Sequence, residues 1–262
     1  MSNFSHNEEL NRKTLTGIND SWLPAPADLT LLANEVHIWR IDLDIVDSLQ
    51  ESFAVTLSSD ELTRANRFRF VEHRQRFIAG RGSLRNILSR YLKIAPQEVR
   101  FDYEPRGKPL LADGLAASGL LFNLSHSQDL ALCAVNYTSK IGIDLEYMRS
   151  VSDLEALAQR FFLPREYELV RSLPPHQQPE AFFRYWTCKE AYLKATGDGI
   201  SQLEQVEISL TPKQPAKLLT SEDWSLVEFT PADNYRAAVA VAASGLDFKY
   251  WQFNERTVKK SS

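Results

Sequence analysis

Residues 141–146 read Ile-Gly-Ile-Asp-Leu-Glu, and this stretch decides the fold. Its alternation is typical of a β-strand, so Asp144 and Glu146, two positions apart, lie on one face while their apolar neighbours point the other way. Residues 41–44, Ile-Asp-Leu-Asp, repeat the pattern in the first half of the chain. The repeat indicates two related halves, each built around a strand of this kind.

The elements predicted around the two strands follow the same order. In the first half they are a strand at 36–43, a helix beginning near its N-cap Ser59, a long helix at 74–92, a short strand at 99–103, a turn at 104–109 and a hairpin of strands at 120–124 and 130–135. In the second half they are the strand at 141–146, a helix beginning at Pro164, a long helix at 179–196 that stops at Gly197, and strands at 206–210, 224–229, 237–242 and 248–253.

This order predicts an α+β fold of two pseudo-symmetric lobes related by internal duplication, with a ligand cleft between them. We expect a loose polar leader at residues 1–30, an N-terminal lobe at 31–138 and a C-terminal lobe at 139–255 that carries the acidic pair. The linker is expected near residues 136–140.

The composition is that of a globular protein. The 262 residues are 44% hydrophobic and 24% charged, with a net charge of −4, which argues against a dedicated nucleic-acid binder. The only cysteines, Cys133 and Cys188, are far apart and are expected to be buried free thiols in a reducing compartment. No signal peptide and no apolar run long enough to cross a membrane are apparent, so a cytoplasmic location is expected.

Acidic side chains form the first candidate site. Two adjacent carboxylates repel unless a cation or a proton lies between them, and Mg²⁺ takes oxygen ligands of this kind. The pair Asp42 and Asp44 shows, however, that the same spacing also fits an ordinary exposed strand face. Glu190 and Lys194 lie four apart on one helix face, where a simple ion pair is the plain alternative.

Basic and polar side chains form a second candidate set, suited to phosphate. Many arginines fall between Arg64 and Arg90, and they fit a solvated helix face, a nucleic-acid surface or a small-molecule phosphate site. Lys108 follows Gly107 in a turn where backbone can approach a ligand closely. Ser125 and His126 are strand neighbours on opposite faces, so they predict phosphate contacts and not a nucleophile pair. No Walker phosphate loop and no dinucleotide fingerprint occurs.

The order of these motifs resembles the 4′-phosphopantetheinyl transferases, in their two-lobed monomeric class of the surfactin-synthetase-activator type. The matching stretches are Gly107-Lys108-Pro109, residues 122–127, residues 142–146, residues 186–194 and residues 197–200. The resemblance implies an Mg²⁺-dependent enzyme, with Mn²⁺ as an alternative ion. It would move the phosphopantetheine arm of coenzyme A, bound between the lobes, to a serine of an apo acyl or peptidyl carrier protein and release 3′,5′-ADP.

The resemblance also assigns roles to individual residues. It implies Asp144, Glu146 and Glu190 as metal ligands, and it implies these coenzyme A contacts: Arg64, Arg76, Lys108, Ser125, His126, Lys189 and Lys194. One basic position of the prototype is Glu61 in this chain, which departs from the pattern. Asp144, Glu190 and Lys194 would be catalytic, with either Glu190 or a metal-bound water taking the serine proton.

Two other functions compete with this reading. One is a catalytically inactive relative that still binds coenzyme A or a nucleotide. The other is a nucleic-acid binder that uses the region from Arg64 to Arg90. The partners expected are coenzyme A and a carrier protein, without nucleic acid or membrane, and the protein is expected to be a monomer.

Overall fold

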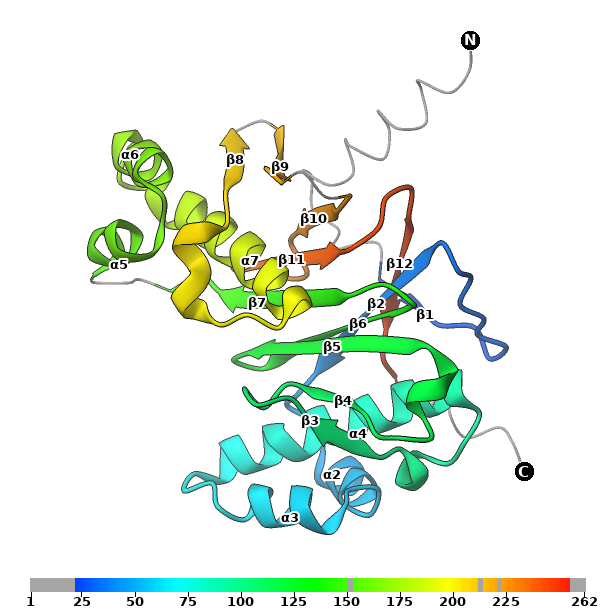
Figure 1. Cartoon of the computed structure of the whole chain (residues 1–262). Helices are drawn as coiled ribbons and strands as arrows, with labels where there is room; N and C mark the ends of the chain where they lie inside the picture. The colour runs from blue at the N-terminus through cyan, green and yellow to red at the C-terminus, as the bar shows by residue number, and fades with distance from the viewer. Residues whose placement is uncertain (1–21, 150–152, 212–213, 221–222, 255–262) are drawn as a thin grey trace. The chain divides into compact units, whose positions relative to one another are not determined.

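The computed structural model describes residues 22–149, 153–211, 214–220 and 223–254, and within them the chain forms two compact units (Figure 1). The N-terminal unit comprises residues 22–138 together with 247–254, and the C-terminal unit comprises residues 139–246. Both mix helices and strands, so the predicted α+β class is confirmed. None of the helices in the described part of the chain has the length and apolar character needed to cross a membrane.

The N-terminal unit is built on a five-stranded sheet with the order β1-β12-β2-β6-β5. Its strands are β1 (Leu23–Pro24), β2 (Glu35–Asp42), β5 (Leu120–Ser127), β6 (Leu130–Tyr137) and β12 (Asp247–Gln252). Strands β5 and β6 form the predicted antiparallel hairpin, and β6 also pairs antiparallel with β2. The apolar residues of β2 and β6 pack with those of the long helix α4 in one core.

The remaining elements of this unit connect the sheet strands. They are α2 (Asp47–Ala54), α3 (Ser59–Ala65), α4 (Val71–Leu92), η2 (Pro96–Glu98), β3 (Phe101–Tyr103), β4 (Pro109–Leu111) and η3 (Ala116–Ser118). Helix α4 begins three residues earlier than predicted and ends at Lys93, whose φ of 57° is left-handed. Helix α2 was not predicted, because only Gln50 and Phe53 of its residues are buried and its apolar pattern is weak.

Two predictions about the chain ends are wrong. Residues 1–21 of the predicted leader lie outside the described residues, but residues 22–30 are not loose, since Ala25 and Leu29 are buried in the N-terminal core. Strand β12 was assigned to the C-terminal lobe, yet it pairs parallel with β2 in the N-terminal sheet. Its pattern predicts a strand correctly, but a pattern does not specify which sheet the strand joins.

The C-terminal unit is built on the antiparallel sheet β10-β11-β7. Its elements are β7 (Ile141–Tyr147), α5 (Leu154–Phe161), α6 (Pro164–Ser172), α7 (Gln178–Thr196), η4 (Ile200–Gln205), β8 (Ile208–Thr211), β9 (Gln214–Leu218), β10 (Ser225–Phe229) and β11 (Tyr235–Val241). Helix α7 ends at Gly197 with φ 85°, as predicted. Helix α5 and strand β9 were not predicted.

The two units repeat one topology. From β2 in one unit and β7 in the other, the chain continues through two short helices and one long helix. It then returns through an antiparallel hairpin whose second strand pairs with β2 or β7, respectively. The order β2-β6-β5 therefore matches β7-β11-β10. This match supports the internal duplication inferred from the sequence, with β12 as an addition to the first copy.

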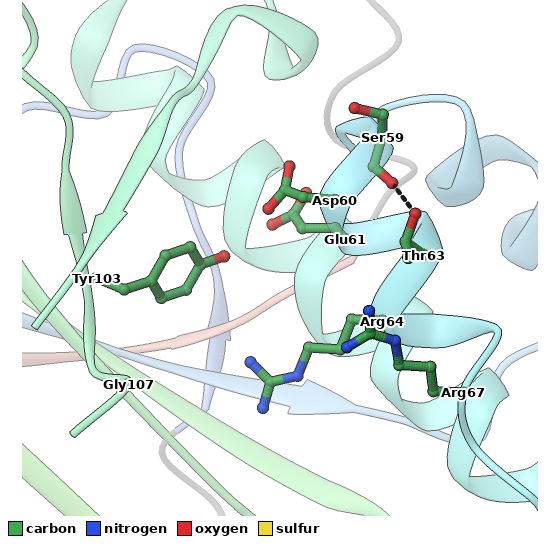
Figure 2. A pocket seen from close by; sticks show the side chains of 8 residues that line it. All are labelled: Ser59, Asp60, Glu61, Thr63, Arg64, Arg67, Tyr103 and Gly107. Atoms are coloured by element: carbon green, nitrogen blue, oxygen red, sulfur yellow. Dashed lines mark hydrogen bonds between the residues drawn. The ribbon is translucent and has the colours of Figure 1, made fainter. Parts of the chain in front are cut away.

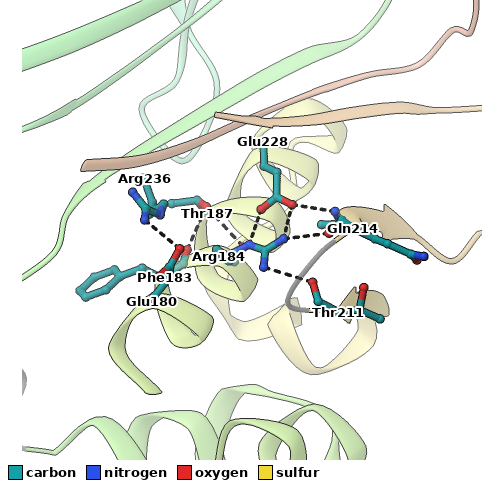
Figure 3. A network of polar contacts seen from close by, with 9 residues as sticks. Glu180, Phe183, Arg184, Thr187, Thr211, Gln214, Glu228 and Arg236 are labelled. Carbon is teal, nitrogen blue, oxygen red and sulfur yellow. Dashed lines mark hydrogen bonds and ion pairs between the residues drawn. The ribbon is translucent and has the colours of Figure 1, made fainter. Parts of the chain in front are cut away.

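A buried ion pair fastens α7 to the C-terminal sheet (Figure 3). Arg184 donates from Nε to Glu228 Oε2 at 2.7 Å and from Nη2 to Glu228 Oε1 at 2.5 Å. The same guanidinium donates to the carbonyl oxygens of Thr211 and Gln214, and the backbone N–H of Ala216 donates to Glu228 Oε1. Bidentate pairing of this kind fixes orientation as well as distance, so it holds α7 in register with the sheet.

His37 is buried in the N-terminal sheet, and its neighbours fix its tautomer. The Trp39 indole can only donate, and it donates to Tyr91 Oη at 2.8 Å. The hydroxyl proton of Tyr91 is therefore available to His37 Nδ1, also 2.8 Å away. It follows that Nδ1 accepts and that Nε2, 3.4 Å from Glu35 Oε2, carries the ring proton.

We expect the N-terminal unit to lose stability as the pH falls from about 6.5 towards 4. Burial lowers the pKa of His37 from 6.5 to about 4, although Glu35 opposes the shift. The unfolded chain takes up this proton first, so the stability is complete above pH 6.5 and falls by about 3 kcal/mol near pH 4. Urea unfolding at several pH values measures the loss. His37→Gln should remove this part of the pH dependence and exposed His176→Gln should not, and the reverse would contradict the assignment.

Candidate active site

Helix α7 lies directly on strand β7, and Gly142 permits the close approach. A Cβ atom at Gly142 would stand 2.1 Å from the carbonyl oxygen of Ala191 and 2.4 Å from the backbone nitrogen of Ala195. Only a residue without a side chain fits against the helix backbone at that distance. Because Glu190 and Lys194 are the helix neighbours of these two alanines, the contact carries them to the strand that bears Asp144.

Asp144, Glu190 and Lys194 come together as the sequence predicted. Lys194 Nζ lies 2.6 Å from Asp144 Oδ1, and Asp144 is only 4% exposed. Glu190 is buried, and its Oε1 has no hydrogen-bond partner among the described residues. Burial, the Asp144 carboxylate and, to a smaller extent, Glu146 raise the pKa of Glu190 to about 7, while Lys194 acts against them. Three carboxylates are therefore held close enough to repel each other.

The donor set fits a hard cation, although the side chains do not yet surround one. In the described residues no group of three or more His, Cys, Asp or Glu side chains converges tightly enough to hold an ion as it stands. The ammonium of Lys194 contacts Asp144 instead. Glu190 Oε1 is nonetheless buried without a hydrogen-bond partner in the described part of the chain, and two further carboxylates lie beside it. Mg²⁺ and similar ions prefer oxygen ligands of this kind.

Lys189 is not available for a ligand, contrary to the prediction. It is fully buried, and its Nζ lies 2.6 Å from Glu166 Oε2, 3.0 Å from the Leu203 carbonyl oxygen and 2.5 Å from the Val206 carbonyl oxygen. These contacts use all three ammonium donors. Glu166 Oε2 also accepts the backbone N–H of Leu163 at the start of α6. Lys189 therefore ties α6 and η4 to α7.

Glu61, the position at which this chain departs from the family pattern, has a structural role in the N-terminal unit. It is 2% exposed, and its Oε2 accepts from the backbone N–H of Ser58 and from Arg85 Nε at 2.8 Å. Ser58, and not the predicted Ser59, is thus the N-cap of α3. Arg85 also donates to the Pro96 and Val99 carbonyl oxygens around η2. This pair is the counterpart of Glu166 and Lys189.

The predicted basic residues border two neighbouring pockets of the N-terminal unit. A pocket of about 590 Å³ is lined by Arg64, Arg76 and His126. Arg64 also lines a second pocket, where it extends from α3 towards the side on which Tyr103 and Gly107 lie (Figure 2). The 590 Å³ pocket brings together residues from α3, α4 and β5, and these were distant in the sequence.

Two further predicted contacts lie beside these pockets without lining them. Ser125 is buried on β5, whereas its neighbour His126 is exposed and reaches the 590 Å³ pocket, so the two side chains lie on opposite faces as expected. Lys108 is half-buried and follows Gly107, whose φ of 82° is left-handed. That backbone conformation is the one the glycine turn requires.

Sequence reasoning singled out Arg76 but missed the rest of the α4 face that forms the wall of the 590 Å³ pocket. The face consists of His73, Arg76, Phe77, Gly80 and Arg81. These residues follow the three- and four-residue spacing of one helix face. That spacing is the signal that could have distinguished Arg76 and Arg81 from the other arginines of the region.

Gly142→Ala should weaken both folding and the site. The added Cβ must push α7 off β7, so we expect the free energy of unfolding to fall by about 1–3 kcal/mol. Displacement of Lys194 from Asp144 should lower any activity of the site at least about tenfold. Thermal melts and activity measurements test this. Gly80→Ala is the control for the thermal melt, because its Cβ would meet only Leu43 Cδ2 at an ordinary 3.5 Å. Its activity is not compared, since Gly80 lines the 590 Å³ pocket. Equal melting of both variants would contradict the packing argument.

Comparisons with known proteins identify a family that both units match. Residues 140–240 match the 4′-phosphopantetheinyl transferase superfamily, and residues 47–138 match the family described as 4′-phosphopantetheinyl transferase, N-terminal. The 4′-phosphopantetheinyl transferase HetI of Nostoc sp. is 66% identical over 90% of this chain and 100% of its own length. The 4′-phosphopantetheinyl transferase Sfp of Bacillus subtilis is 30% identical over 62% of this chain and 69% of its own.

A solved structure with a lower likeness is the holo-(acyl-carrier-protein) synthase of Bacillus anthracis in complex with CoA (3′,5′-ADP). It is 23% identical, with a TM-score of 0.35, over 39% of this chain and 93% of that one. The family therefore rests on the sequence matches, which cover both units.

Proposed function

We propose that this chain, which belongs to the 4′-phosphopantetheinyl transferase superfamily, moves the phosphopantetheine arm of coenzyme A to a serine of an apo acyl or peptidyl carrier protein. The observation that carries the proposal is the contact of Lys194 with Asp144 beside the buried Glu190. A lysine and several carboxylates in one place suit phosphoryl chemistry, in which charge must be offset on a leaving phosphate.

The proposed metal is Mg²⁺, with Mn²⁺ as an alternative, held by Asp144, Glu146 and Glu190. When bound, it would neutralise the pyrophosphate and polarise the phosphorus under attack. Lys194 is 29% exposed, so it can leave Asp144 for a phosphate oxygen. The chemistry of the carboxylates and the partnerless Glu190 oxygen support this assignment.

In the proposed reaction the serine oxygen forms a bond to the phosphorus that carries pantetheine. The bond from that phosphorus to the bridging oxygen breaks, and 3′,5′-ADP leaves. Lys194 offsets the charge that develops on the leaving group. Glu190 or a water takes the serine proton, and Glu190 Oε1 has no other hydrogen-bond partner among the described residues.

The nucleotide end of coenzyme A is proposed to bind in the N-terminal unit. The 590 Å³ pocket offers Arg64, Arg76 and His126 to phosphate, and Phe68 and Phe77 to the base. Lys108 and Ser125 remain proposed contacts from the neighbouring turn and strand. Lys189 is left out of this set, because all its donors are used by the protein.

A loading assay tests the function. The protein is incubated with coenzyme A, Mg²⁺ and an apo carrier protein, and the carrier should gain the mass of one phosphopantetheine arm. A carrier whose acceptor serine is replaced by alanine is the control. Binding of coenzyme A without loading of any carrier would identify an inactive relative, and salt-sensitive gel shifts with DNA or RNA would instead favour nucleic-acid binding.

A monomer in the cytoplasm is also proposed. The burial of both free cysteines is compatible with a reducing compartment, and burial raises the pKa of the Cys133 thiol, which keeps it unreactive. Light scattering on the purified protein tests the oligomeric state.

A further inference from the structure

A basic and apolar surface lies where helix α4 begins, at one end of the N-terminal unit (Figure 1). Residues 66–75 are ten consecutive exposed residues, although most of α4 beyond them is buried. We call four of them, Arg69, Phe70, Val71 and Arg74, the α4 tip. None of the four lines either pocket of the candidate site. The proposed reaction therefore gives them no role.

The α4 tip exposes apolar surface that the N-terminal core does not include. Phe70 is 60% exposed and Val71 is 68% exposed, and neither belongs to the core cluster of this unit. The Phe70 ring is instead held from two sides, with the Arg69 guanidinium carbon and the His73 ring centre each 5.6 Å away. An aromatic ring is thus fixed in place with most of its surface open to solvent.

Phe70 also occupies a position where other residues would stabilise the helix better. It is the N-cap of α4, and no side-chain hydrogen bond caps the helix there. Serine, threonine, aspartate and asparagine are favoured at this position because their side chains accept from free N–H groups of the first turn. A residue that departs from such a local rule is expected at a functional surface. The ring of Phe70 is therefore better explained by a contact outside this chain than by helix stability.

The two arginines of the α4 tip have no anionic partner. Glu72 is the only carboxylate between residues 66 and 75, and it pairs with Arg76. Neither Arg69 nor Arg74 forms an ion pair within the part of the chain that the structure describes. The first turn of α4 adds positive partial charge beside them. Because these like charges repel each other, a negatively charged partner would bind here favourably.

The residue types of the α4 tip favour an acidic protein over other anions. The whole chain has a net charge of −4, which suits nucleic acid poorly. Its basic residues in this region are arginines, since no lysine occurs between Lys13 and Lys93. The planar guanidinium can bind both oxygens of a carboxylate, and arginine and aromatic side chains are enriched where protein interfaces gain most of their affinity.

We propose that the α4 tip docks the apo carrier protein through an acidic and partly apolar surface of that carrier. The inference rests on the proposed function, in which a carrier brings its serine to the enzyme and leaves once it is loaded. Four residues make a small contact, and small interfaces are typical of weak, transient complexes. Complementary charge lets such a complex form rapidly. Fast and weak docking suits an enzyme that must release each loaded carrier.

Loading kinetics, with the carrier and coenzyme A varied separately, test the role of the charges. Arg69→Glu combined with Arg74→Glu should lower kcat/KM for the carrier by about tenfold or more and leave the KM for coenzyme A within about twofold. Added NaCl should bring the wild-type protein closer to the double variant. Arg100→Glu is the matched control, because Arg100 is an exposed arginine of the same unit outside both pockets, and it should load like wild type.

Phe70→Ser tests the apolar part and separates docking from a structural role. It should lower kcat/KM for the carrier by about three- to tenfold. It should nevertheless melt at or above the wild-type temperature, because serine can cap α4. A merely structural role would lower the melting temperature instead. Val55→Ser is the control, since Val55 is 73% exposed at the end of α2, and it should leave carrier loading unchanged.

Binding of a carrier whose acceptor serine is replaced by alanine distinguishes this inference from the proposed function. Wild-type protein that binds this carrier but loads none would contradict the proposed function alone. Equal carrier binding and loading by the wild type and the double variant would overturn the docking inference alone. The inference also fails if the double variant loses binding to RNA or to anionic phospholipid vesicles while its carrier loading is unchanged. Wild-type protein that binds no carrier overturns both.

A reversal of charge on the carrier completes the test. Carriers with single acidic residues replaced by lysine are loaded by the variant that carries Arg69→Glu and Arg74→Glu. At least one of them should be loaded faster by this variant than the unaltered carrier is, because the new lysine meets the new glutamates. If no reversed carrier restores any loading, the α4 tip does not contact an acidic surface of the carrier.

Discussion

Asp144→Asn is expected to lower carrier loading by about three orders of magnitude, which corresponds to about 4 kcal/mol of transition-state stabilisation. The carboxylate is the group that contacts Lys194 and that we propose as a metal ligand. The variant should still fold, because asparagine fills the same space and the repulsion on Glu190 is relieved. Mass spectrometry of the carrier gives the rate, and a thermal melt gives the stability.

The duplicated strand provides the matched control. Asp42 occupies on β2 the position that Asp144 occupies on β7, but it is exposed and contacts only Gln252 Nε2, at 3.3 Å, among the side-chain bonds of the described residues. Asp42→Asn should therefore load carriers at the wild-type rate. Addition of Mg²⁺ should raise the melting temperature of wild-type protein and of Asp42→Asn, but not of Asp144→Asn. Loading by Asp144→Asn at the wild-type rate would refute the metal assignment.

Lys189→Met is expected to lower the free energy of unfolding by about 3–5 kcal/mol, because it leaves Glu166 as an unpaired buried charge. The ammonium it removes also binds two carbonyl oxygens around η4. Burial lowers the pKa of Lys189, and the Glu166 carboxylate opposes that shift. Glu166 therefore helps to keep the buried ammonium charged. Urea unfolding followed by circular dichroism measures the loss.

Two further variants show whether the loss comes from the buried pair. Lys249→Met removes a half-exposed lysine that pairs with Asp247, and it should cost less than about 1 kcal/mol. Glu166→Gln combined with Lys189→Met removes both charges and should recover much of the stability. If Lys189→Met instead kept its stability and lost affinity for coenzyme A, the contact between Lys189 and coenzyme A that the resemblance implied would be restored.

The sequence by itself indicated most of the secondary structure, the duplication and the acidic residues of the candidate site, but not α2, α5 or β9. Alternating apolar residues and glycine positions located β7, the β5–β6 hairpin and the end of α7. Spacing placed Asp144 and Glu146 on one strand and Glu190 with Lys194 on one helix face. These features follow from local geometry, because strands repeat every two residues and helices every three to four.

Only the tertiary structure decided which polar side chain meets which partner. Lys189 and Lys194 belong to one motif on one helix, yet Lys189 is enclosed by Glu166 and backbone carbonyls while Lys194 reaches Asp144. Likewise, β12 has a clear strand pattern but joins the N-terminal sheet. Periodicity gives the face on which a side chain lies, and the free energy of burying its charge depends on residues far away in the chain.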